Sequence, residues 1–234
     1  IDKNEKLGGA LVQATKGELK KDLAAYLHYL KKQVQKSSIK LILHTTATKE
    51  LIQQEKPDVL IIAIGAKAII PKIKGIDCDN VFMAMDFLDR GFNHVSQTTT
   101  ILGAGSIGCE IALELADMGK EVNLIEMSNT LAKNGNELYR VSLLQHILNN
   151  PHIHIMMESQ CIEVMEKACI VKTKDEILTI PHDEFVISVG YQKDIQAVYQ
   201  YFGIIPKTYY VGDCKRVASV TEAVTEGYFL GANL

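Results

Sequence analysis

Apolar residues recur along the chain with two different periods, and the alternation of these periods predicts an α/β fold. Across Gly17–Gln35 they return every three or four positions, which predicts an amphipathic helix with lysines on its outer face. Ile39–Leu43 predicts a strand, and Thr48 is suited to cap a short helix that stops before Pro57. The run Val59–Ile64 is apolar at every position. Such a run is typical of a parallel strand covered by helices on both faces.

The middle of the chain predicts a complete βαβ unit. Thr98–Leu102 has the pattern of a strand, and a glycine-rich turn follows it. A helix then runs to Gly119, and Val122–Ile125 supplies the second strand. A short helix around Phe82–Leu88 is expected before this unit, and another near Glu137–Leu148 after it.

Short apolar runs in the last third of the chain predict more strands. Three of them are separated by turn residues and predict a small antiparallel meander: His152–Met157, Cys161–Met165 and Ala168–Thr173. Further strands are expected at Ile177–Ile180 and Phe185–Val189, then a strand entering Tyr209–Asp213 and a helix over Val220–Asn233. Strands that alternate with helices indicate the α/β class, with an antiparallel insertion.

Charge and cysteine content exclude several classes. The 234 residues carry a net charge of −3, so no broad positive field for nucleic acid or an anionic membrane is expected. The longest apolar run, Val59–Ala66, is far shorter than the ~20 residues of a membrane span, and the charged start Ile1–Lys6 is unlike a secretory leader. Five scattered cysteines without a C-x-x-C pair indicate a reducing compartment, so we expect a cytoplasmic protein without a zinc or iron–sulfur site of its own.

The candidate chemistry lies in the glycine-rich turn, which has the spacing G-x-G-x-x-G. Its residues are Gly103, Ala104, Gly105, Ser106, Ile107 and Gly108. Gly103 suits a tight turn, Gly105 lets a pyrophosphate approach the backbone, and Gly108 lets helix and strand pack closely. The start of the helix offers free N–H groups to phosphates. These features predict a dinucleotide site. The alternatives are a packing turn that tolerates glycine and the related loop of a methyltransferase.

Glu126 completes the pattern at the end of the following strand. It lies eighteen residues beyond Gly108, where an acidic side chain accepts hydrogen bonds from the hydroxyls of the adenosine ribose. Its charge would repel a 2′-phosphate. The sequence therefore favours NAD(H) over NADP(H).

Four segments in order resemble a known family. They are Leu7–Ala10, Asp58–Ala66 with Pro71 and Gly75 after it, Gly103–Glu110, and Tyr210–Cys214. The order and gaps are similar to the FAD/NAD-binding region of flavoproteins with two dinucleotide-binding domains. The resemblance is closest to the C-terminal half of the NADH:flavin oxidoreductase, 2,4-dienoyl-CoA reductase and 2-enoate reductase family, and it covers nearly the whole chain.

The resemblance implies two Rossmann-like domains, each a parallel sheet with helices, plus the meander. Residues 1–95 and 194–234 would form the FAD domain, and residues 96–193 the NAD domain. It also implies that NADH reduces FAD, which passes electrons to an N-terminal barrel carrying FMN and an iron–sulfur cluster. No side chain need act as acid or nucleophile. The paired cysteines of disulfide reductases are absent, so a disulfide substrate is not expected.

The family's cofactor residues can be placed on this sequence one by one. Besides the glycine-rich turn and Glu126, Glu110 matches a glutamate near the contact of nicotinamide with flavin, although the helix dipole alone would also favour an acid there. Gly190 matches a second glycine turn beside NAD. On the FAD side the matching residues are Asp2, Leu7, Gly8, Gly9, Ala63, Gly65, Gly212, Asp213 and Ala223.

Three of these carry specific roles in the resemblance. Asp213 would bind the ribityl chain of FAD, and Ala223 would begin the helix aimed at the flavin. Capping of the following loop is the other interpretation of Asp213. Asp2 matches the acid that ends the second strand of the FAD domain. The first strand, glycine loop and helix of that domain would then be missing.

Two departures from the family suggest a second hypothesis. Ile64 replaces a threonine near FAD, and the incomplete FAD half should leave open strand edges. We therefore expect homodimerisation or strand swapping through that half. The alternative to an electron-transfer module is a non-catalytic module that only binds an adenine nucleotide.

Other polar and thiol groups have ordinary structural interpretations. His152 and His154 are expected on a solvated strand face, and Cys109 is expected to pack against the sheet. The pairs Lys20–Lys21 and Lys31–Lys32 are expected on the solvated face of a helix.

Overall fold

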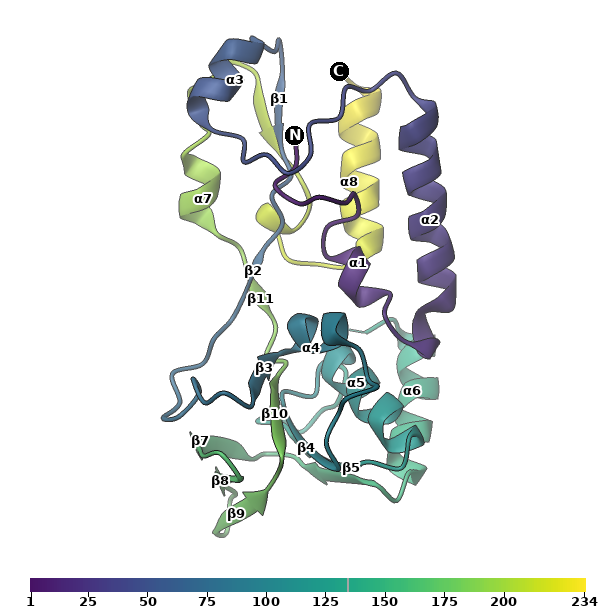
Figure 1. Ribbon diagram of the computed structural model, residues 1–234, viewed down its shortest axis with the longest axis vertical. Helices are drawn as coiled ribbons and strands as arrows, with labels where there is room; N and C mark the ends of the chain where they lie inside the picture. Colours follow the sequence, from purple (N-terminus) through teal and green to yellow (C-terminus); the bar gives the residue numbers. More distant parts are fainter. Residues whose placement is uncertain (134) are drawn as a thin grey trace. The chain divides into compact units, whose positions relative to one another are not determined.

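The computed structural model describes residues 1–133 and 135–234, and these form two compact units that interleave along the chain. The first unit comprises residues 1–11, 25–69 and 191–234, and the second comprises residues 12–24 and 70–190 (Figure 1). Each unit is built around its own parallel strands. The assignment of one cofactor to each expected domain stays a prediction.

A parallel sheet forms the centre of the second unit. Within the described residues its order is β3 (Val81–Met83), β10 (Glu184–Ile187), β4 (Thr98–Leu102), β5 (Glu121–Ile125) and β6 (Ile153–Met156). All neighbouring strands in it run parallel. The expected βαβ unit is therefore present, with β4 beside β5 and the connecting helix α5 (Ser106–Asp117) between them in sequence.

The central sheet is covered differently on its two faces. Helices α4 (Ala84–Arg90), α5 and α6 (Glu137–Asn149) cover one face, and the antiparallel meander of β7 (Gln160–Val164), β8 (Ala168–Lys172) and β9 (Ile177–Pro181) packs against the other. Neighbouring residues of β4 show the alternation, because Ile101 packs with the helices and Leu102 packs with the meander. The expected α/β class with a small antiparallel meander is confirmed.

Two expected elements of the second unit take different roles. The run His152–Met157 was expected in the meander, but β6 pairs parallel with β5, and Ile177–Pro181 supplies the third meander strand instead. Phe82 was expected in a helix, yet Val81–Met83 forms a strand beside β10, and the helix begins only at Ala84. A short apolar run can join either kind of element, and the available neighbours decide.

The first unit has two separate two-stranded sheets among its described residues. Strands β1 (Leu60–Ile62) and β12 (Thr208–Tyr210) pair parallel, and β2 (Lys67–Ala68) pairs antiparallel with β11 (Tyr191–Gln192). The helices with residues in this unit are α1 (Leu11–Ala14), α2 (Lys21–Lys36), α3 (Lys49–Glu55), α7 (Ile195–Tyr199), the 3₁₀ turn η2 (Gly212–Cys214) and α8 (Val220–Ala232). A short 3₁₀ turn, η1 (Glu18–Lys20), precedes α2.

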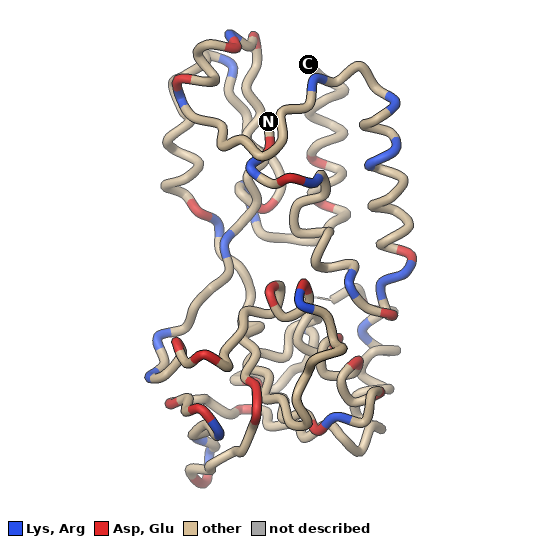
Figure 2. The backbone as a smooth tube through the Cα atoms, in the orientation of Figure 1, with Lys and Arg blue, Asp and Glu red and all other residues tan. Residues whose placement is uncertain are grey.

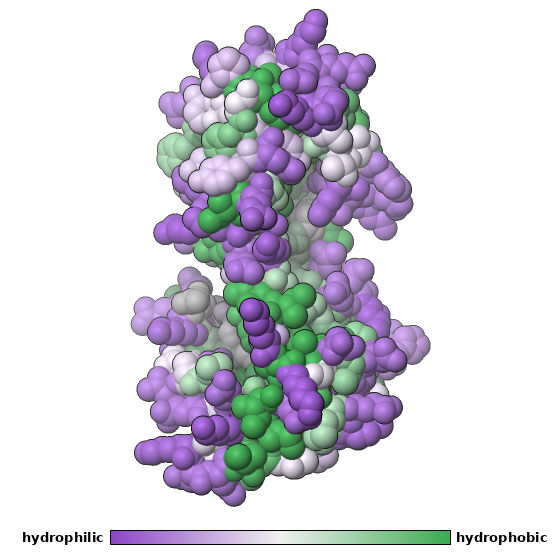
Figure 3. Space-filling view, turned by 90° about the vertical axis from the view of Figure 1, so that its left-hand side faces the viewer, coloured by the Kyte–Doolittle hydropathy of each residue, from purple (hydrophilic) through white to green (hydrophobic). Residues whose placement is uncertain are grey.

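One strand prediction for the first unit is wrong, and another is confirmed as a parallel strand but not in its burial. Ile39–Leu43 forms no strand, although Ile42 accepts a backbone hydrogen bond from Asp2 at 2.9 Å. The run Val59–Ile64 was expected to be covered on both faces, but Ile61 is 44% exposed and Ile64 46% exposed. In the described part of the chain, β1 pairs only with β12. The β1–β12 sheet therefore presents apolar side chains to solvent. On the face that Figure 3 displays, the largest continuous apolar surface lies in the lower half of the view.

Helix ends follow the sequence signals closely. The Thr48 hydroxyl accepts the Leu51 N–H at the start of α3, and Ser219 with Glu222 forms a capping box at the start of α8.

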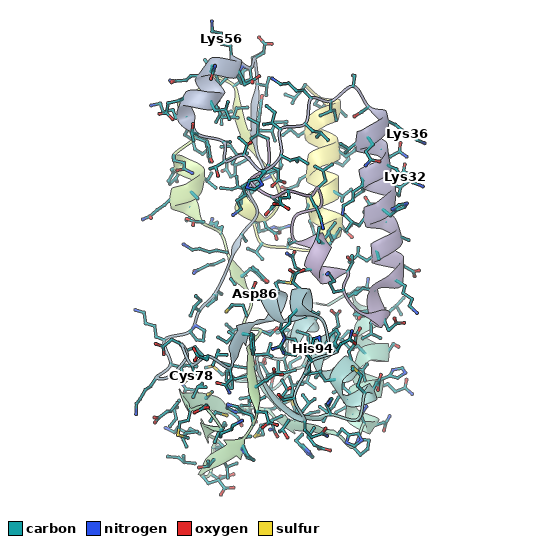
Figure 4. All side chains as sticks on the ribbon, in the orientation of Figure 1. Lys32, Lys36, Lys56, Cys78, Asp86 and His94 are labelled. Carbon is teal, nitrogen blue, oxygen red and sulfur yellow. The ribbon has the colours of Figure 1, made fainter. Side chains whose placement is uncertain are left out.

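On α2, Lys32 and Lys36 point away from the chain into solvent (Figure 4).

Charges are spread over both units. Both units carry basic and acidic residues, while the charged residues from Lys31 to Lys49 are all lysines, several of them along α2 (Figure 2). No helix among the described residues is long and apolar enough to cross a membrane.

Candidate dinucleotide site

Three glycines shape the turn between β4 and α5. Gly103 has φ +98°, and a Cβ built there would lie 2.5 Å from the Ser188 carbonyl oxygen. A Cβ on Gly108 would lie 2.1 Å from the Gly103 carbonyl oxygen, so the helix packs directly on the turn. Gly105 differs from both, because nothing lies within 4 Å of its Cβ position. Two glycines thus permit close packing, and the third leaves open space above the backbone.

The open space lies at the N-terminus of α5. Gly105 is the N-cap residue, its carbonyl accepts the first helical hydrogen bond from Cys109, and no side chain caps this end of the helix. The backbone N–H groups of Ser106 and Ile107 begin the helix and carry its positive dipole end. A phosphate placed here would meet N–H donors without a side chain in the way.

Glu126 ties the turn to the end of β5. Its Oε2 accepts the Ala104 N–H at 2.8 Å, and its Oε1 accepts the Ser128 N–H at 2.8 Å. Each carboxylate oxygen has a second lone pair, so both can accept a further hydrogen bond. The residue therefore lies where the sequence places it, and its orientation is set by two backbone donors.

The end of β10 borders the same turn. The Ser188 N–H donates to the Leu102 carbonyl at 2.7 Å, next to the first glycine of the turn. Gly190 follows with φ +99° and nothing within 4 Å of its Cβ position. The end of β10, which leads to Gly190, therefore lies beside the glycine-rich turn.

Glu110 has partners that the sequence did not reveal. Lys20 Nζ lies 2.6 Å from Glu110 Oε1, and Tyr139 Oη donates to the same oxygen at 2.9 Å. Lys20 was expected on a solvated helix face, and this prediction is wrong, because its side chain is 26% exposed and paired with Glu110. The lysine pattern around it gave no signal of this contact, since the partners lie on separate segments of the second unit.

The predicted FAD residues lie in the first unit. Gly212 has φ +68° and donates its N–H to Glu226 at 2.9 Å, and a Cβ on it would lie 3.7 Å from that of Ala223. Asp213 Oδ1 accepts the Ala218 N–H at 3.2 Å, so this aspartate does cap the following loop. Ala223 does not begin α8, which starts at Val220, because Ser219 provides the cap.

The remaining predicted FAD residues lie in loops and turns of the same unit. Asp2 Oδ1 accepts the Asn4 N–H at 2.8 Å. Gly8, Gly9 and Gly65 all have positive φ, at 126°, 52° and 74°. Leu7 lies in the turn that contains Gly8 and Gly9, and Ala63 lies in the loop that follows β1. Their role toward FAD stays a prediction.

Cys109 and the two histidines have structural surroundings. Burial raises the pKa of the Cys109 thiol to about 12, as expected for a thiol packed in the core. His152 and His154 contact the two oxygens of Glu121 at 2.7 and 2.9 Å, and these hydrogen bonds lower the pKa of that carboxyl. Over the described residues, no group of three or more His, Cys, Asp or Glu side chains is arranged to hold a metal ion.

Comparison with known proteins gives relatives that match the whole chain. Bilirubin reductase of Mediterraneibacter gnavus is 30% identical over 241 aligned residues, covering 100% of this chain and 36% of the relative. Cinnamate reductase of Clostridium sporogenes is 27% identical, covering 100% of this chain and 35% of the relative. The chain thus spans about a third of the length of these curated relatives.

A solved structure and a family model agree with these matches. The structure of 2-naphthoyl-CoA reductase in complex with 2-naphthoyl-CoA superposes with a TM-score of 0.90 at 29% identity, covering 100% of this chain and 35% of that one. The family model described as pyridine nucleotide-disulphide oxidoreductase matches residues 9–227. Because that match takes in the glycine-rich turn, Glu126 and both units, the chain belongs to the pyridine nucleotide-disulphide oxidoreductase family.

Proposed function

We propose that this chain is the nucleotide-binding part of a flavoprotein oxidoreductase, which takes electrons from NADH, passes them to FAD and delivers them to a partner domain. Membership of the family implies NAD(H) and FAD as cofactors. The relatives are named for the reduction of different compounds, bilirubin and cinnamate, yet both contain the part, about a third of their length, that matches this chain. We therefore assign the nicotinamide and flavin chemistry that the relatives have in common to the part that matches this chain. Reduction of the final compound would take place in a partner domain with FMN and an iron–sulfur cluster.

The observation that carries the proposal is the open space over Gly105 at the N-terminus of α5. Gly103 and Gly108 close the turn tightly on either side, while the position above Gly105 is free and faces N–H donors. A pyrophosphate fits such a site, because it is anionic and needs close approach to the backbone. Glu126 lies at the end of the adjacent strand, as required for the adenosine ribose.

The residues of this chain would bind and orient the dinucleotide. NADH, when bound, supplies a hydride that FAD accepts. Glu126 would accept hydrogen bonds from the ribose hydroxyls, and its charge would disfavour the 2′-phosphate of NADPH. The backbone at Gly105 and Ser106 would hold the pyrophosphate, and the nicotinamide end would extend toward Gly190. We propose no side chain as general acid or base, because hydride transfer between the two cofactors requires none.

Residues in the first unit would hold FAD. Glycines with positive φ at Gly9, Gly65 and Gly212 allow the backbone to turn sharply, and nothing lies within 4 Å of the Cβ positions of Gly9 and Gly65. Asp213 uses Oδ1 on its own loop, which leaves Oδ2 for a hydroxyl of the ribityl chain.

Substitution of Gly105 tests the nicotinamide assignment. In Gly105→Val, the branched side chain fills the open space, and we expect NADH binding, followed by isothermal titration calorimetry, to be lost. Gly227→Val is the matched control, because Gly227 also has open space at its Cβ position but lies in α8. Unchanged NADH affinity in Gly105→Val would contradict the proposal.

A non-catalytic module that binds only an adenine nucleotide is the second candidate. The two-stranded sheet of the first unit favours it, as do the internal partners of Gly212 and Asp213. The visible absorption spectrum of the purified protein separates the two candidates. A flavin band supports the electron-transfer module, whereas a colourless protein that binds NADH supports the second candidate.

The open sheet edges of the first unit also favour self-association. In the described residues, β1 and β12 each have one neighbouring strand, and an exposed strand edge is a template for pairing. We propose that two copies associate through these edges. A monomeric mass by light scattering over a wide concentration range would contradict this.

A further inference from the structure

Two of the five cysteines meet inside the antiparallel meander. Cys161 lies on β7 and Cys169 on β8, and both belong to the apolar core that the meander forms with the central sheet. Cys161 is 2% exposed and Cys169 is fully buried. Their spacing in the sequence does not indicate a pair, because the contact depends on how the two strands are aligned.

A shift in the β7–β8 register places Cys161 on the same face as Cys169. Cys161 lies opposite Val171 and Val164 lies opposite Cys169, so three residue steps along β7 match two steps along β8. In a regular strand, residues three apart point to opposite faces. The extra residue keeps Cys161 and Val164 on the buried face, whereas Ile162 between them is 39% exposed. The two cysteines are therefore diagonal neighbours on one face, where side chains can reach each other.

A chain of hydrogen bonds joins the two thiols. The Cys169 thiol bonds to Cys161 Sγ, and the Cys161 thiol donates to the Glu163 carbonyl oxygen at 3.6 Å. The bond between the thiols lowers the pKa of Cys161, and this bond together with burial raises the pKa of Cys169. Cys109 and Cys214 differ, because their thiols donate to backbone carbonyls. In the part of the chain that the structure describes, no other two thiols are paired in this way.

We propose that Cys161 and Cys169 are a modification site, at which a small hydroperoxide converts the two thiols into a reversible disulfide between β7 and β8. Burial of both thiols favours a small oxidant such as hydrogen peroxide over a bulky one. The second thiol is already in contact with the first, so it can react before further oxidation takes place. The inference does not depend on the proposed function, because it concerns neither the glycine-rich turn nor the first unit.

The chemistry has two steps, and Cys161 reacts first because the thiolate is the nucleophile. Its sulfur attacks one peroxide oxygen, so an S–O bond forms, the O–O bond breaks and the other oxygen leaves as water. The sulfur of Cys169 then attacks the sulfenic acid on Cys161. The S–S bond forms, the S–O bond breaks, and the leaving oxygen takes the Cys169 proton to give a second water. Two thiols and one hydrogen peroxide thus yield one disulfide and two waters.

Counting thiols in the wild-type chain tests this proposal. The folded protein is oxidised with hydrogen peroxide, treated with catalase and alkylated in denaturant. We expect mass spectrometry to find five alkylated cysteines before oxidation and three after it, with dithiothreitol restoring all five. Trypsin cleaves after Lys167, between the two cysteines, so the disulfide should join peptide 141–167 to peptide 168–172.

Three variants provide controls for the thiol count. Cys109→Ser is the matched control, because Cys109 is also fully buried but donates to the Ala104 carbonyl rather than to a thiol. It should still lose two thiols on oxidation. Cys161→Ser and Cys169→Ser should each form no cross-linked peptide under the same treatment. Circular dichroism before and after oxidation monitors the fold, and the wild-type peptide map tests the inference even where a variant folds poorly.

Four outcomes would overturn the inference. The first is five alkylated cysteines in the folded wild type after oxidation. The second is a disulfide that links any other pair of cysteines. The third is oxidation of Cys161 to a sulfinic or sulfonic acid without a link to Cys169. The fourth is a link that forms only in urea, because the native strand alignment would then not bring the two thiols together.

Discussion

Replacement of Glu126 by glutamine tests the chemistry at the adenosine end of the proposed site. In the folded protein the two oxygens of Glu126 accept the N–H groups of Ala104 and Ser128, each at 2.8 Å. A hydrogen bond to a charged group contributes about 1.5–3 kcal/mol. In Glu126→Gln, one oxygen remains, and the NH₂ group faces a backbone N–H that is also a donor. We therefore expect unfolding free energy to fall by about 1.5–3 kcal/mol, the value of one such bond.

The effect on ligand choice is the more specific part of this prediction. Loss of the charge removes the best acceptor for the ribose hydroxyls, so NADH affinity should fall by about 10- to 100-fold. The same loss relieves repulsion of the 2′-phosphate, so NADPH affinity should change little or rise. Titration calorimetry with both nucleotides at pH 7 measures the ratio, and urea denaturation followed by circular dichroism measures stability.

Glu121→Gln provides the matched control. Glu121 lies at the opposite end of β5 from Glu126, where its carboxylate contacts two histidines. It should leave both nucleotide affinities unchanged. If Glu126→Gln kept the wild-type ratio of NADH to NADPH affinity while remaining folded at the assay temperature, the assignment of Glu126 to the adenosine ribose would be refuted.

Two further predictions concern the stability of the second unit. Arg90 Nη2 lies 2.8 Å from Oε1 of Glu184, which is 7% exposed. Arg90→Met removes the charged partner of this buried carboxylate and leaves the Ser96 N–H, which donates to Oε2 at 3.2 Å. We expect this variant to cost about 3–5 kcal/mol in urea denaturation and the double variant Arg90→Met/Glu184→Leu to recover much of that loss. A double variant as unstable as the single one would contradict this prediction. Hydrogen bonds from His152 and His154 depress the folded pKa of Glu121 below its usual 4.5, so its contribution is present above pH 4.5 and is lost as the pH falls through the folded pKa. Below pH 4.5, the urea midpoint should therefore fall less steeply with decreasing pH in Glu121→Gln than in the wild type. The same slope in both proteins would argue against these contacts.

Local features of the fold could be predicted from the sequence because their causes lie within a few residues. The strand, glycine turn and helix from Thr98 to Gly119 follow from periodicity and from backbone sterics at the glycines. The Thr48 cap is likewise a contact between near neighbours in the chain. Such features need no knowledge of distant segments.

Pairing of strands was harder to predict. The runs at Ile153–Met156 and Ile177–Pro181 are both short and apolar enough to be strands, yet the first joins the parallel sheet and the second joins the meander. The choice depends on which edge is free beside β5 and β8 once the chain has folded. For the same reason the exposure of Ile61 could not be predicted, since it depends on what else packs on β1.

By itself, the sequence determined the α/β class, the glycine-rich turn and the acidic residue at the end of the next strand. These depend on short-range periodicity and on which residues the backbone tolerates at a turn. Only the tertiary structure decided that Lys20 and Tyr139 hold one oxygen of Glu110 and leave the other free. Side chains from three separate segments meet there, and their meeting depends on packing between elements, which no local pattern encodes.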